Sequence, residues 1–274
     1  MNTNPTSSGK DSTAAADGTI SAVYPLPVRG PEFQRAQPGL VRRLEAISAA
    51  TACAKLNGLG IRRTFVNGPR PLEGGHKAVG SAVTLQFMPQ REDIASGMTQ
   101  EDIERHTALW EVLETIQPGD VLVVQAYGSE LTGCFGDMLV RYFKHRGGAA
   151  IVVDGRIRDS ARVKQLGVPI WCTGVTPHYA SQFDLFPWAY DVPVAVGGVL
   201  CLPGDIVIAD DDGPVVVPVA KSLELLSDAE EHEKWEEFSR MRIDQGGRLS
   251  DYYPLGPQSR PEYDAWCAAG RQMS

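Results

Sequence analysis

The sequence predicts a single α/β domain with a central mixed β-sheet flanked by helices. Two observations behind this prediction are global. The chain has 274 residues, and its 43% hydrophobic and 22% charged residues are typical of a globular protein that folds without disulfide or metal support. The third is local: between residues 120 and 172, short β-branched apolar runs alternate with helical patterns, which indicates βαβ units and a parallel or mixed sheet.

The part of the chain that precedes residue 120 begins with a stretch rich in Ser, Thr, Asn and Ala. This stretch, residues 1–19, is predicted to be a disordered tail, so that the domain covers residues 20–241. Periodicity and breaking residues then define three elements. They are a helix at 40–56, a strand at 79–87 and an amphipathic helix at 106–116.

The central and C-terminal elements follow from the same criteria. Buried strands are predicted at 120–124, 149–153 and 169–172, with helices at 137–145 and 160–166. Strands separated by tight Gly/Asp turns, which predict antiparallel hairpins, follow at 192–199, 206–209 and 214–219. A strongly charged helix, 220–241, precedes a C-terminal extension, 242–274. Tyr and Trp residues are scattered through the extension, so we expect it to pack on the domain or on a neighbouring subunit.

Charge and cysteine content exclude several classes of protein. The formal net charge is −8, whereas nucleic-acid binding and anionic membrane surfaces require a basic face. No apolar run approaches the roughly 18 residues of a membrane helix. The five cysteines are odd in number and include no Cys-x-x-Cys pair, which argues against a disulfide framework or a structural zinc site. We expect a cytoplasmic protein.

A glycine-containing loop, Gly133 to Asp137, leaves one predicted strand and enters a helix. The unpaired N–H groups at a helix start favour an anion. Asp137 also fits a plain helix-capping role, which is the alternative interpretation of this loop.

Arg158 and Asp159 follow the next predicted strand. Twenty residues separate Asp137 from Arg158, about one helix and one strand, so these side chains are expected to meet at the carboxyl edge of the sheet. An Arg suits a carboxylate or an oxyanion, and an Asp suits a hard divalent cation. The spacing alone leaves open a surface ion pair of little consequence.

These motifs, taken together, resemble the RraA-like superfamily. That superfamily includes the class II, metal-dependent pyruvate aldolases that cleave 4-hydroxy-4-methyl-2-oxoglutarate and 4-carboxy-4-hydroxy-2-oxoadipate. The resemblance covers roughly residues 40–240. It is carried by GDVLVV at 119–124, GCFGD at 133–137, VVDGRIRD at 152–159, LGVPI at 166–170, PGDIV at 203–207 and DGPVVVP at 212–218.

The resemblance implies a swivelling α/β/α fold and a role for each site residue. Arg158 would stabilise a pyruvate enolate, Asp159 would bind Mg²⁺ or Mn²⁺, and Asp137 would orient a water that shuttles a proton. It also implies contact between the metal waters and an acidic residue from the late helix of an adjacent subunit; Glu233 is our choice, with Glu230 and Glu231 as alternatives. The implied substrate-binding residues are Gly133, Gly136, Met138, Leu139 and Arg158.

The function implied is cleavage of a 4-hydroxy-2-oxo acid to pyruvate and a carbonyl product, with oxaloacetate decarboxylation as a side activity. A trimer or hexamer of the chain is expected with it, and a small 2-keto acid as the ligand. The family's RNase E regulator lacks the Asp after the motif Arg, so Asp159 favours the enzyme. Two alternatives remain: a non-enzymatic regulator of ribonuclease activity, and a lyase or hydratase acting on a sugar-derived keto acid. Gln125 to Ser129, which replace the family's usual Asp and glycine run, motivate the latter.

The remaining candidate residues carry weaker hypotheses. His178 follows Pro177 near a strand end and is a candidate to line the pocket. Cys134 lies in the loop without an evident His partner and is interpreted as a packing residue. A second substrate carboxylate has Arg62, Arg63 and Arg70 as candidates, although solvation at the surface explains them equally.

Overall fold

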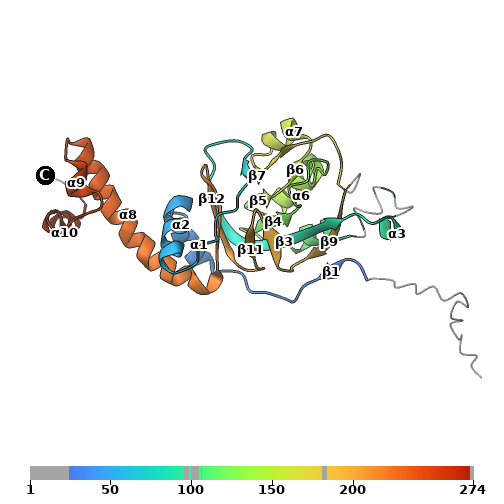
Figure 1. The fold of residues 1–274 in the computed structure, drawn as a ribbon, viewed down its shortest axis with the longest axis horizontal. Coiled ribbons are helices and arrows are strands. Elements are labelled where there is room, and N and C mark those ends of the chain that lie inside the picture. Colours follow the sequence, from blue (N-terminus) through green and yellow to red (C-terminus); the bar gives the residue numbers. More distant parts are fainter. Residues whose placement is uncertain (1–24, 96–98, 100–104, 106, 181–183, 272–274) are drawn as a thin grey trace, which may run out of the picture.

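The computed structural model describes residues 25–95, 99, 105, 107–180 and 184–271. The tail predicted at 1–19 lies outside these residues. The described chain forms a body built around one sheet, and an arm formed by a long helix that carries a small helical lobe at its far end (Figure 1). None of the described helices combines the length and the apolar composition that crossing a membrane requires.

The sheet of the body is mixed, as predicted. Parallel pairing joins β3, β4, β5 and β7, whereas β9 and β2 add antiparallel edges in the order β1-β9-β3-β4-β5-β7-β2. The strands are β1 (Val28–Arg29), β2 (Arg70–Pro71), β3 (Ala78–Pro89), β4 (Val121–Gln125), β5 (Ala150–Val153), β7 (Ile170–Cys172) and β9 (Leu185–Tyr190). The central strands are buried on both faces, which explains their continuous apolar runs.

The two faces of the sheet are covered by different elements. Alternate residues of β4 show the division: Leu122 and Val124 face the helical side, whereas Val121 and Val123 face the other side. The helical cover consists of α5 (Ala108–Thr115), α6 (Asp137–His145) and α7 (Ser160–Gln165). On the opposite face, the cover is the hairpin of β10 (Val194–Val196) and β11 (Val199–Cys201).

The second half of the body is built on β12 (Ile206–Asp210) and β13 (Gly213–Val217), an antiparallel pair whose turn holds Asp211 and Asp212 as predicted. β12 also pairs with the first residues of β3, so this hairpin extends the sheet. The helices α1 (Pro38–Leu44) and α2 (Ala49–Gly58) pack on it together with the start of α8 (Ser222–Asp244).

Two predicted elements differ from the structure. The single helix predicted at 40–56 is two helices, because the chain turns at residues 45–48 and Ser48 caps α2 by accepting a hydrogen bond from the Thr51 N–H. The strand predicted at 192–199 is instead the hairpin β10–β11, with Gly197 and Gly198 in its turn at positive φ.

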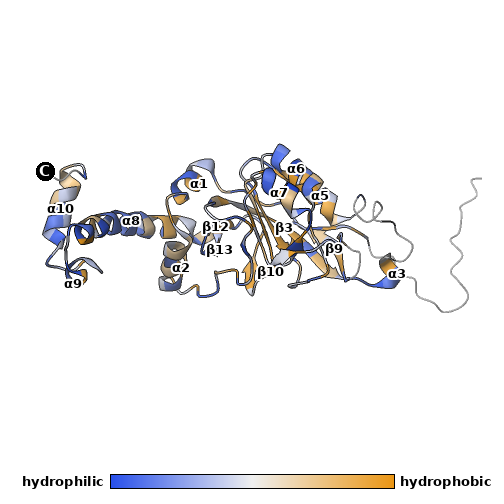
Figure 2. Cartoon of the chain, turned by 90° about the horizontal axis from the view of Figure 1, so that it is seen from above, coloured by the Kyte–Doolittle hydropathy of each residue, from blue (hydrophilic) through white to orange (hydrophobic). Residues whose placement is uncertain are grey.

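The C-terminal extension lies at the far end of α8, away from the body (Figure 2). Its helices α9 (Leu249–Tyr252) and α10 (Arg260–Ala268) fold back on the last turns of α8. Phe238, Tyr263 and Trp266 form a separate buried cluster there. We call residues 235–271 the distal lobe. Within the chain the extension therefore contacts α8, and its contact with a neighbouring subunit stays a prediction.

The described part of the chain also contains two short helical segments and two short strands that shape the loops. These are α3 (Glu92–Ala95), β6 (Arg156–Ile157), β8 (Gly174–Val175) and the 3-10 turn η1 (Val219–Lys221). Of these, β6 and β8 form a two-stranded parallel ribbon beside the main sheet.

Candidate active site

The predicted site residues follow three chain segments that run side by side in the same direction. β6 pairs with β8 in parallel, and Gly133 makes a parallel bridge to Arg156 on the other side of β6. Because parallel segments end at the same edge, the residues that follow each segment are brought together.

Backbone hydrogen bonds fix these segments at the point where they end. The Arg158 N–H donates to the Phe135 carbonyl at 2.9 Å, and the Thr176 N–H donates to the Ile157 carbonyl at 2.9 Å. Arg158 is therefore held between the loop that enters α6 and the segment that leaves β8.

The start of α6 lies against Arg158 and Asp159. A Cβ atom on Gly136 would lie 2.6 Å from Asp159 Oδ2 and 2.9 Å from Arg158 Nε, both closer than real Cβ contacts. Its φ of −112° is open to any residue, so what favours glycine here is the approach of these two side chains, which a Cβ would force to move. The start of α6 therefore lies beside Arg158 and Asp159, and the meeting of the Asp137 side chain with them stays a prediction.

The interpretation of Asp137 as the cap of α6 is wrong. The capping residue is Gly136, which has no side chain to cap with, and Asp137 is the first residue of the helix. The first N–H groups of α6, from Asp137 to Leu139, therefore remain the donors available to an anion. The half-buried Asp137 carboxylate is left for another role.

Arg158 and Asp159 interact only loosely with each other. Arg158 Nε lies 3.6 Å from Asp159 Oδ2, and their side chains are 31% and 36% exposed. An ion pair of this exposure contributes little to stability. Both groups therefore remain accessible to a ligand.

Asp159 has an unusual backbone conformation. Its φ of 56° and ψ of 32° lie in the left-handed region, which costs a non-glycine residue about 1 kcal/mol or more. It precedes α7 in the capping position, yet its carboxylate makes no capping hydrogen bond. The strained residue thus presents a carboxylate that the helix does not use, which is common at functional sites.

An open hollow adjoins this carboxylate. It has a volume of about 500 Å³ and is lined by Asp159, Ser160 and Arg162 on one side and by Val175, Thr176 and Pro177 on the other. Arg162 is exposed and was not predicted from the sequence. The candidates Arg62, Arg63 and Arg70 are exposed elsewhere and do not line this hollow.

The residues of the site fit a Mg²⁺ ion that is held by one carboxylate better than a metal that is enclosed by three or more protein ligands. Across the described ranges, no three His, Cys, Asp or Glu side chains converge on one point. Mg²⁺ is usually held by one or two carboxylates, with waters and substrate oxygens completing its coordination. The exposed Asp159 carboxylate is suited to that open arrangement.

The acidic residues of α8 do not join this site within one chain. Glu233 accepts a hydrogen bond from Thr51 Oγ1 at 2.9 Å, and Glu230 pairs with Arg43 at 2.7 Å. Glu231 is 3.5 Å from Arg260. α8 and α6 lie on opposite sides of the body in both ribbon views (Figures 1 and 2). Contact with the site of an adjacent subunit stays a prediction.

Asp154 is a buried residue at the end of β5 to which the sequence analysis assigned no role. Its carboxylate is 8% exposed and accepts hydrogen bonds from the N–H groups of Ala126 and, at 3.2 Å, Gly197. Burial raises the pKa of Asp154 to about 6. The carboxylate joins the loop after β4 to the β10–β11 turn. Its place at the end of β5, in VVDGRIRD, was the available sequence signal.

The segment that departs from the family pattern has structural contacts. Gln125 is 4% exposed, and its side-chain oxygen accepts a hydrogen bond from the Ala195 N–H at 2.8 Å, on the face covered by β10. Ser129 donates to Asp184 at 2.6 Å, and Thr132 also donates to that carboxylate. The loop is thus fixed before it reaches Gly133.

Cys134 and His178 differ in their surroundings. Cys134 is fully buried, and burial raises the pKa of its thiol, which fits the predicted packing role. His178 is half-buried, and its Nδ1 lies 3.2 Å from Thr176 Oγ1. It lies two residues after Thr176, which lines the hollow, but His178 itself is not among the lining residues.

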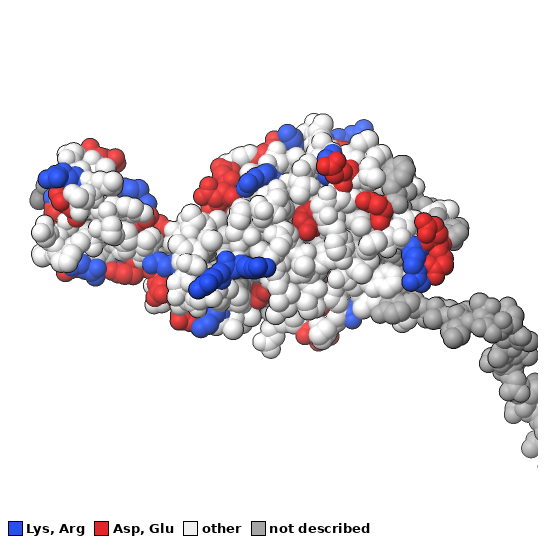
Figure 3. All heavy atoms as spheres, viewed as in Figure 1, with Lys and Arg blue, Asp and Glu red and all other residues white. Residues whose placement is uncertain are grey.

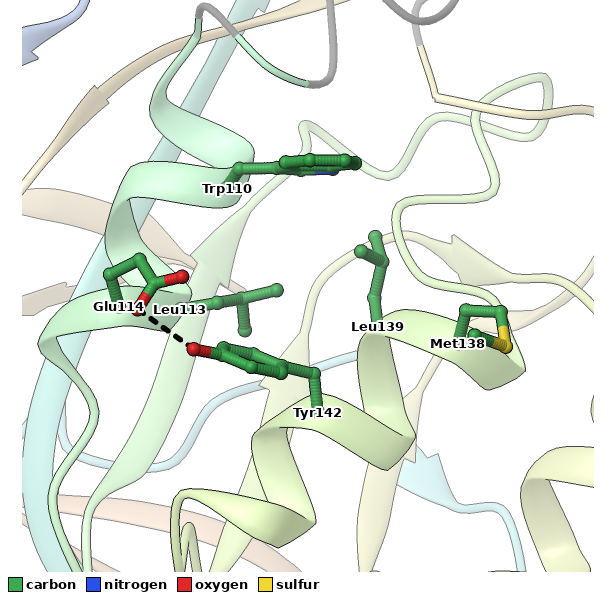
Figure 4. Close-up of a pocket in the computed structure, with 6 residues that line it drawn as sticks. All are labelled: Trp110, Leu113, Glu114, Met138, Leu139 and Tyr142. Carbon is green, nitrogen blue, oxygen red and sulfur yellow. Dashed lines mark hydrogen bonds between the residues drawn. The ribbon is translucent and has the colours of Figure 1, made fainter.

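A second hollow lies between α5 and α6, with a volume of about 230 Å³. Figure 4 shows Trp110, Leu113 and Leu139 around it, with Tyr142 donating a hydrogen bond to Glu114 at 2.7 Å. Met138, 69% exposed, lies at its end. The lining is mostly carbon, and its carboxylate, that of Glu114, accepts the hydrogen bond from Tyr142.

The chain is similar to several known proteins. The RraA-like family model, described as Aldolase/RraA, matches residues 49–217. A protein of Halalkalibacterium halodurans that carries the provisional name of a 4-hydroxy-4-methyl-2-oxoglutarate aldolase is 32% identical over 174 residues, 64% of this chain and 75% of its own length.

Solved structures show the same fold. The crystal structure of Streptomyces coelicolor RraAS2, described as an unusual member of the RNase ES inhibitor RraA protein family, is 66% identical with a TM-score of 0.71; the match covers 77% of this chain and 100% of that one. A Pseudomonas syringae pv. tomato protein is 22% identical with a TM-score of 0.71, covering 83% of this chain and 98% of its own, which shows likeness of fold alone.

Proposed function

Because the chain belongs to the RraA-like family, we propose that its site is that of a divalent-metal-dependent carbon–carbon lyase acting on 4-hydroxy-2-oxo acids. The observation that carries the proposal is the convergence of Arg158 and Asp159 on Gly136 at the start of α6. At this point lie the Arg158 guanidinium, the Asp159 carboxylate, which makes no capping hydrogen bond, and the first N–H groups of α6. The guanidinium and the N–H groups suit the negative charges of a 2-keto acid and its enolate, and the carboxylate suits a divalent cation.

The residues divide the work as follows. The N–H groups at the start of α6 bind the substrate carboxylate, and Arg158 holds the C2 oxygen as it gains negative charge. When bound at Asp159, Mg²⁺ or Mn²⁺ supplies Lewis-acid polarisation of the same oxygens. The C4 hydroxyl gives its proton to the water that Asp137 orients, the C3–C4 bond breaks, and its electrons form the enolate while the C4 oxygen becomes the carbonyl of the product. The same water then returns the proton to C3, which yields pyruvate.

Oxaloacetate is the simplest test of the enolate half of this chemistry. Loss of its C4 carboxylate as carbon dioxide leaves the same pyruvate enolate, and no hydroxyl proton has to be removed. We therefore propose that the protein also decarboxylates oxaloacetate, and the two reactions share Arg158 and Asp159.

We also propose that the chain assembles as a trimer or hexamer in which Glu233 faces the metal waters of an adjacent subunit. The proposal is supported by the separation of α8 from the site within one chain and by the projection of the arm from the body (Figure 1). Light scattering on the purified protein tests it, because a monomeric mass would contradict it.

The lyase is tested by pyruvate release from 4-hydroxy-4-methyl-2-oxoglutarate and from oxaloacetate, with Mg²⁺ and with EDTA. We expect metal-dependent release from both, reduced at least about 100-fold in Arg158→Ala. Asp159→Asn should have a similar effect without backbone strain, because Asn tolerates the left-handed conformation. Asp264→Asn, in the distal lobe, is the matched control. Release that survives EDTA or Arg158→Ala would contradict the assignment.

A second candidate function is inhibition of a ribonuclease of the RNase ES type. It is favoured by the 66% identity to RraAS2 over the whole of that chain, a more similar relative than the named aldolase. Its test is RNA cleavage by purified RNase ES with increasing amounts of this protein. Inhibition by both the native chain and Asp159→Asn would assign a binding function that is independent of the site.

A further inference from the structure

We propose that Arg162 sets the substrate specificity of this site by binding a second carboxylate, on the half of the substrate that leaves as the carbonyl product. The inference rests on the proposed lyase function. It goes beyond that function by selecting, among 4-hydroxy-2-oxo acids, those whose carbonyl half is anionic over those whose carbonyl half is a neutral, hydroxylated chain.

The first support is the place of Arg162 beside the residue proposed to hold the metal. Asp159 precedes α7, Arg162 is the third residue of that helix, and the Arg162 N–H donates to the Asp159 carbonyl at 2.9 Å. Both residues line the same hollow of about 500 Å³. A substrate that is held at Asp159 and extends into the hollow therefore meets Arg162.

The second support is that the fold does not use the Arg162 guanidinium. Within the described part of the chain, this side chain is exposed and forms no ion pair or hydrogen bond. The guanidinium of Arg156, by contrast, donates to the Val175 carbonyl at 3.2 Å and lies 3.1 Å from the Glu130 carboxylate. The charge of Arg162 is therefore available to a ligand.

The third support is the opposite wall of the hollow, which consists of Val175, Thr176 and Pro177. None of these side chains is charged, and Val175 is 45% exposed. The Thr176 hydroxyl lies 3.2 Å from His178 Nδ1, so it already has a partner. Against such a wall, sugar hydroxyls would lose hydrogen bonds to water, whereas an alkyl substituent would not. A carboxylate next to an alkyl group fits both the wall and Arg162.

The fourth support is the continuity between this hollow and the rest of the site. A Cβ atom on Gly133 would lie 3.2 Å from Arg158 Cβ and 3.3 Å from Thr176 Cγ2. The residue proposed to hold the C2 oxygen and one wall of the hollow thus contact the same glycine. Arg158, Asp159 and Arg162 are therefore arranged to contact one ligand along its length.

The charges of a dicarboxylate match this arrangement. Cleavage of 4-hydroxy-4-methyl-2-oxoglutarate gives two molecules of pyruvate, so each half of the substrate carries one carboxylate. In the proposal the N–H groups at the start of α6 bind one carboxylate, and Arg162 binds the other. Arg162 stays protonated throughout and exchanges no proton with the substrate. It binds the ground state and the transition state alike, so its contribution is to KM.

The experiment compares three substrates that share the reacting atoms. They are 4-hydroxy-4-methyl-2-oxoglutarate, 4-hydroxy-2-oxopentanoate with its neutral methyl end, and 2-keto-3-deoxygluconate with its hydroxylated end. Pyruvate release with Mg²⁺ is measured for the native chain, Arg162→Gln and Arg162→Lys. We expect the native chain to favour the dicarboxylate at least about tenfold in kcat/KM, because a hydrogen bond between charged groups contributes that factor.

Arg162→Gln should lose this preference through a higher KM for the dicarboxylate, with less than about a threefold change on the other two substrates. Arg162→Lys should keep part of it, since Lys retains the charge but not the two-pronged contact. Lys164→Gln, on the same helix but outside the lining of the hollow, is the matched control and should keep the whole preference.

The dependence on salt separates recognition of charge from a structural role. Exposed charges are screened by salt, so the KM of the native chain for the dicarboxylate should rise with NaCl more steeply than that of Arg162→Gln. A structural role would leave the two dependences parallel.

Equal losses on all three substrates in Arg162→Gln, or an unchanged preference for the dicarboxylate, would overturn the role of Arg162 and leave the lyase standing. A native chain that favours 2-keto-3-deoxygluconate would do the same. A native chain that releases pyruvate from none of the three would overturn the lyase and this inference with it.

Discussion

The edge of the sheet that holds Arg158 and the distal lobe at the end of α8 are built on opposite principles. At the sheet edge, glycines such as Gly136 let charged side chains approach the backbone and remain partly exposed. In the distal lobe, Phe238, Tyr263 and Trp266 are buried against each other, with ring centroids 5.5 to 6.2 Å apart.

The charges of the two regions differ in the same way. Near the far end of α8, Arg and Glu side chains pair with each other, as Arg260 with Glu231 and Arg271 with Glu237. Figure 3 shows side chains of both charges on the surface of this part of the molecule. At the sheet edge, Arg158 and Asp159 are only loosely paired. The lobe uses its side chains to stay folded, whereas the sheet edge keeps its polar groups available because the backbone already fixes them.

The largest expected effect of a substitution lies in the lobe. Phe238→Ala should destabilise it by about 4 kcal/mol, because a fully buried ring is lost from a cluster that has few other members. Hydrogen exchange followed by mass spectrometry should show lost protection at residues 249–268 and unchanged protection in β3 to β5.

The control for this prediction is Arg43→Ala, which removes an exposed ion pair with Glu230 at the root of the arm and should cost about 0.5 kcal/mol or less. Equal loss of protection in the sheet and in the lobe after Phe238→Ala would mean that the two regions unfold together, and would end the contrast drawn between them.

The second effect is the converse, a loss of activity without a loss of stability. Gly136→Ala should reduce pyruvate release about 100-fold, because its Cβ displaces the ends of Arg158 and Asp159 from their positions. The melting temperature should change by only a few degrees, since both side chains have solvent to move into. The melting temperature and the rate of pyruvate release are measured on the same preparation, and a variant that keeps its rate would contradict the prediction. Gly39→Ala, where an added Cβ has no atom within 4 Å, is the matched control.

The last prediction concerns Asp154, whose buried carboxylate joins the loop after β4 to the β10–β11 turn. Its folded pKa of about 6 lies above its ordinary value of 3.8, so the folded state binds its proton more tightly than the unfolded state does. Its contribution to stability is therefore fully present below pH 4 and is lost as the pH rises through 6, a change of about 3 kcal/mol.

Urea unfolding of the native chain and of Asp154→Asn between pH 4 and pH 7 measures this contribution. The free energy of unfolding should decline with pH more steeply in the native chain than in the variant. Parallel curves would show that Asp154 titrates at the same pH in both states.

The sequence predicted the site better than it predicted the lobe, for a physical reason. Helix α6 runs from Asp137 to His145 as predicted, and parallel strands deliver their carboxyl ends to one edge whatever the details of packing. The lobe depends on contacts between α8 and α10, such as Phe238 with Trp266, which periodicity does not encode.

Local signals explain the remaining differences. Ser48 is a good helix cap, but the apolar residues on both sides of it keep the helical period, so the break before α2 was missed. Pro187 lowered the strand signal of β9, which nevertheless pairs with β3 through a register shift at Gln86 and Phe87. Thr176 and Arg162 carry no motif, and only the fold places them at the hollow.

Strand β3 has a consequence for how the body resists force and heat. Its first residues, Ala78–Ser81, pair with β12, and Ala82–Pro89 pair with β4 and β9, so one strand belongs to both halves of the body. Neither half can detach without breaking a ladder that the other shares. The body should therefore unfold as one cooperative unit. β3 is the strand shared by the half that carries the arm and the half that carries Arg158.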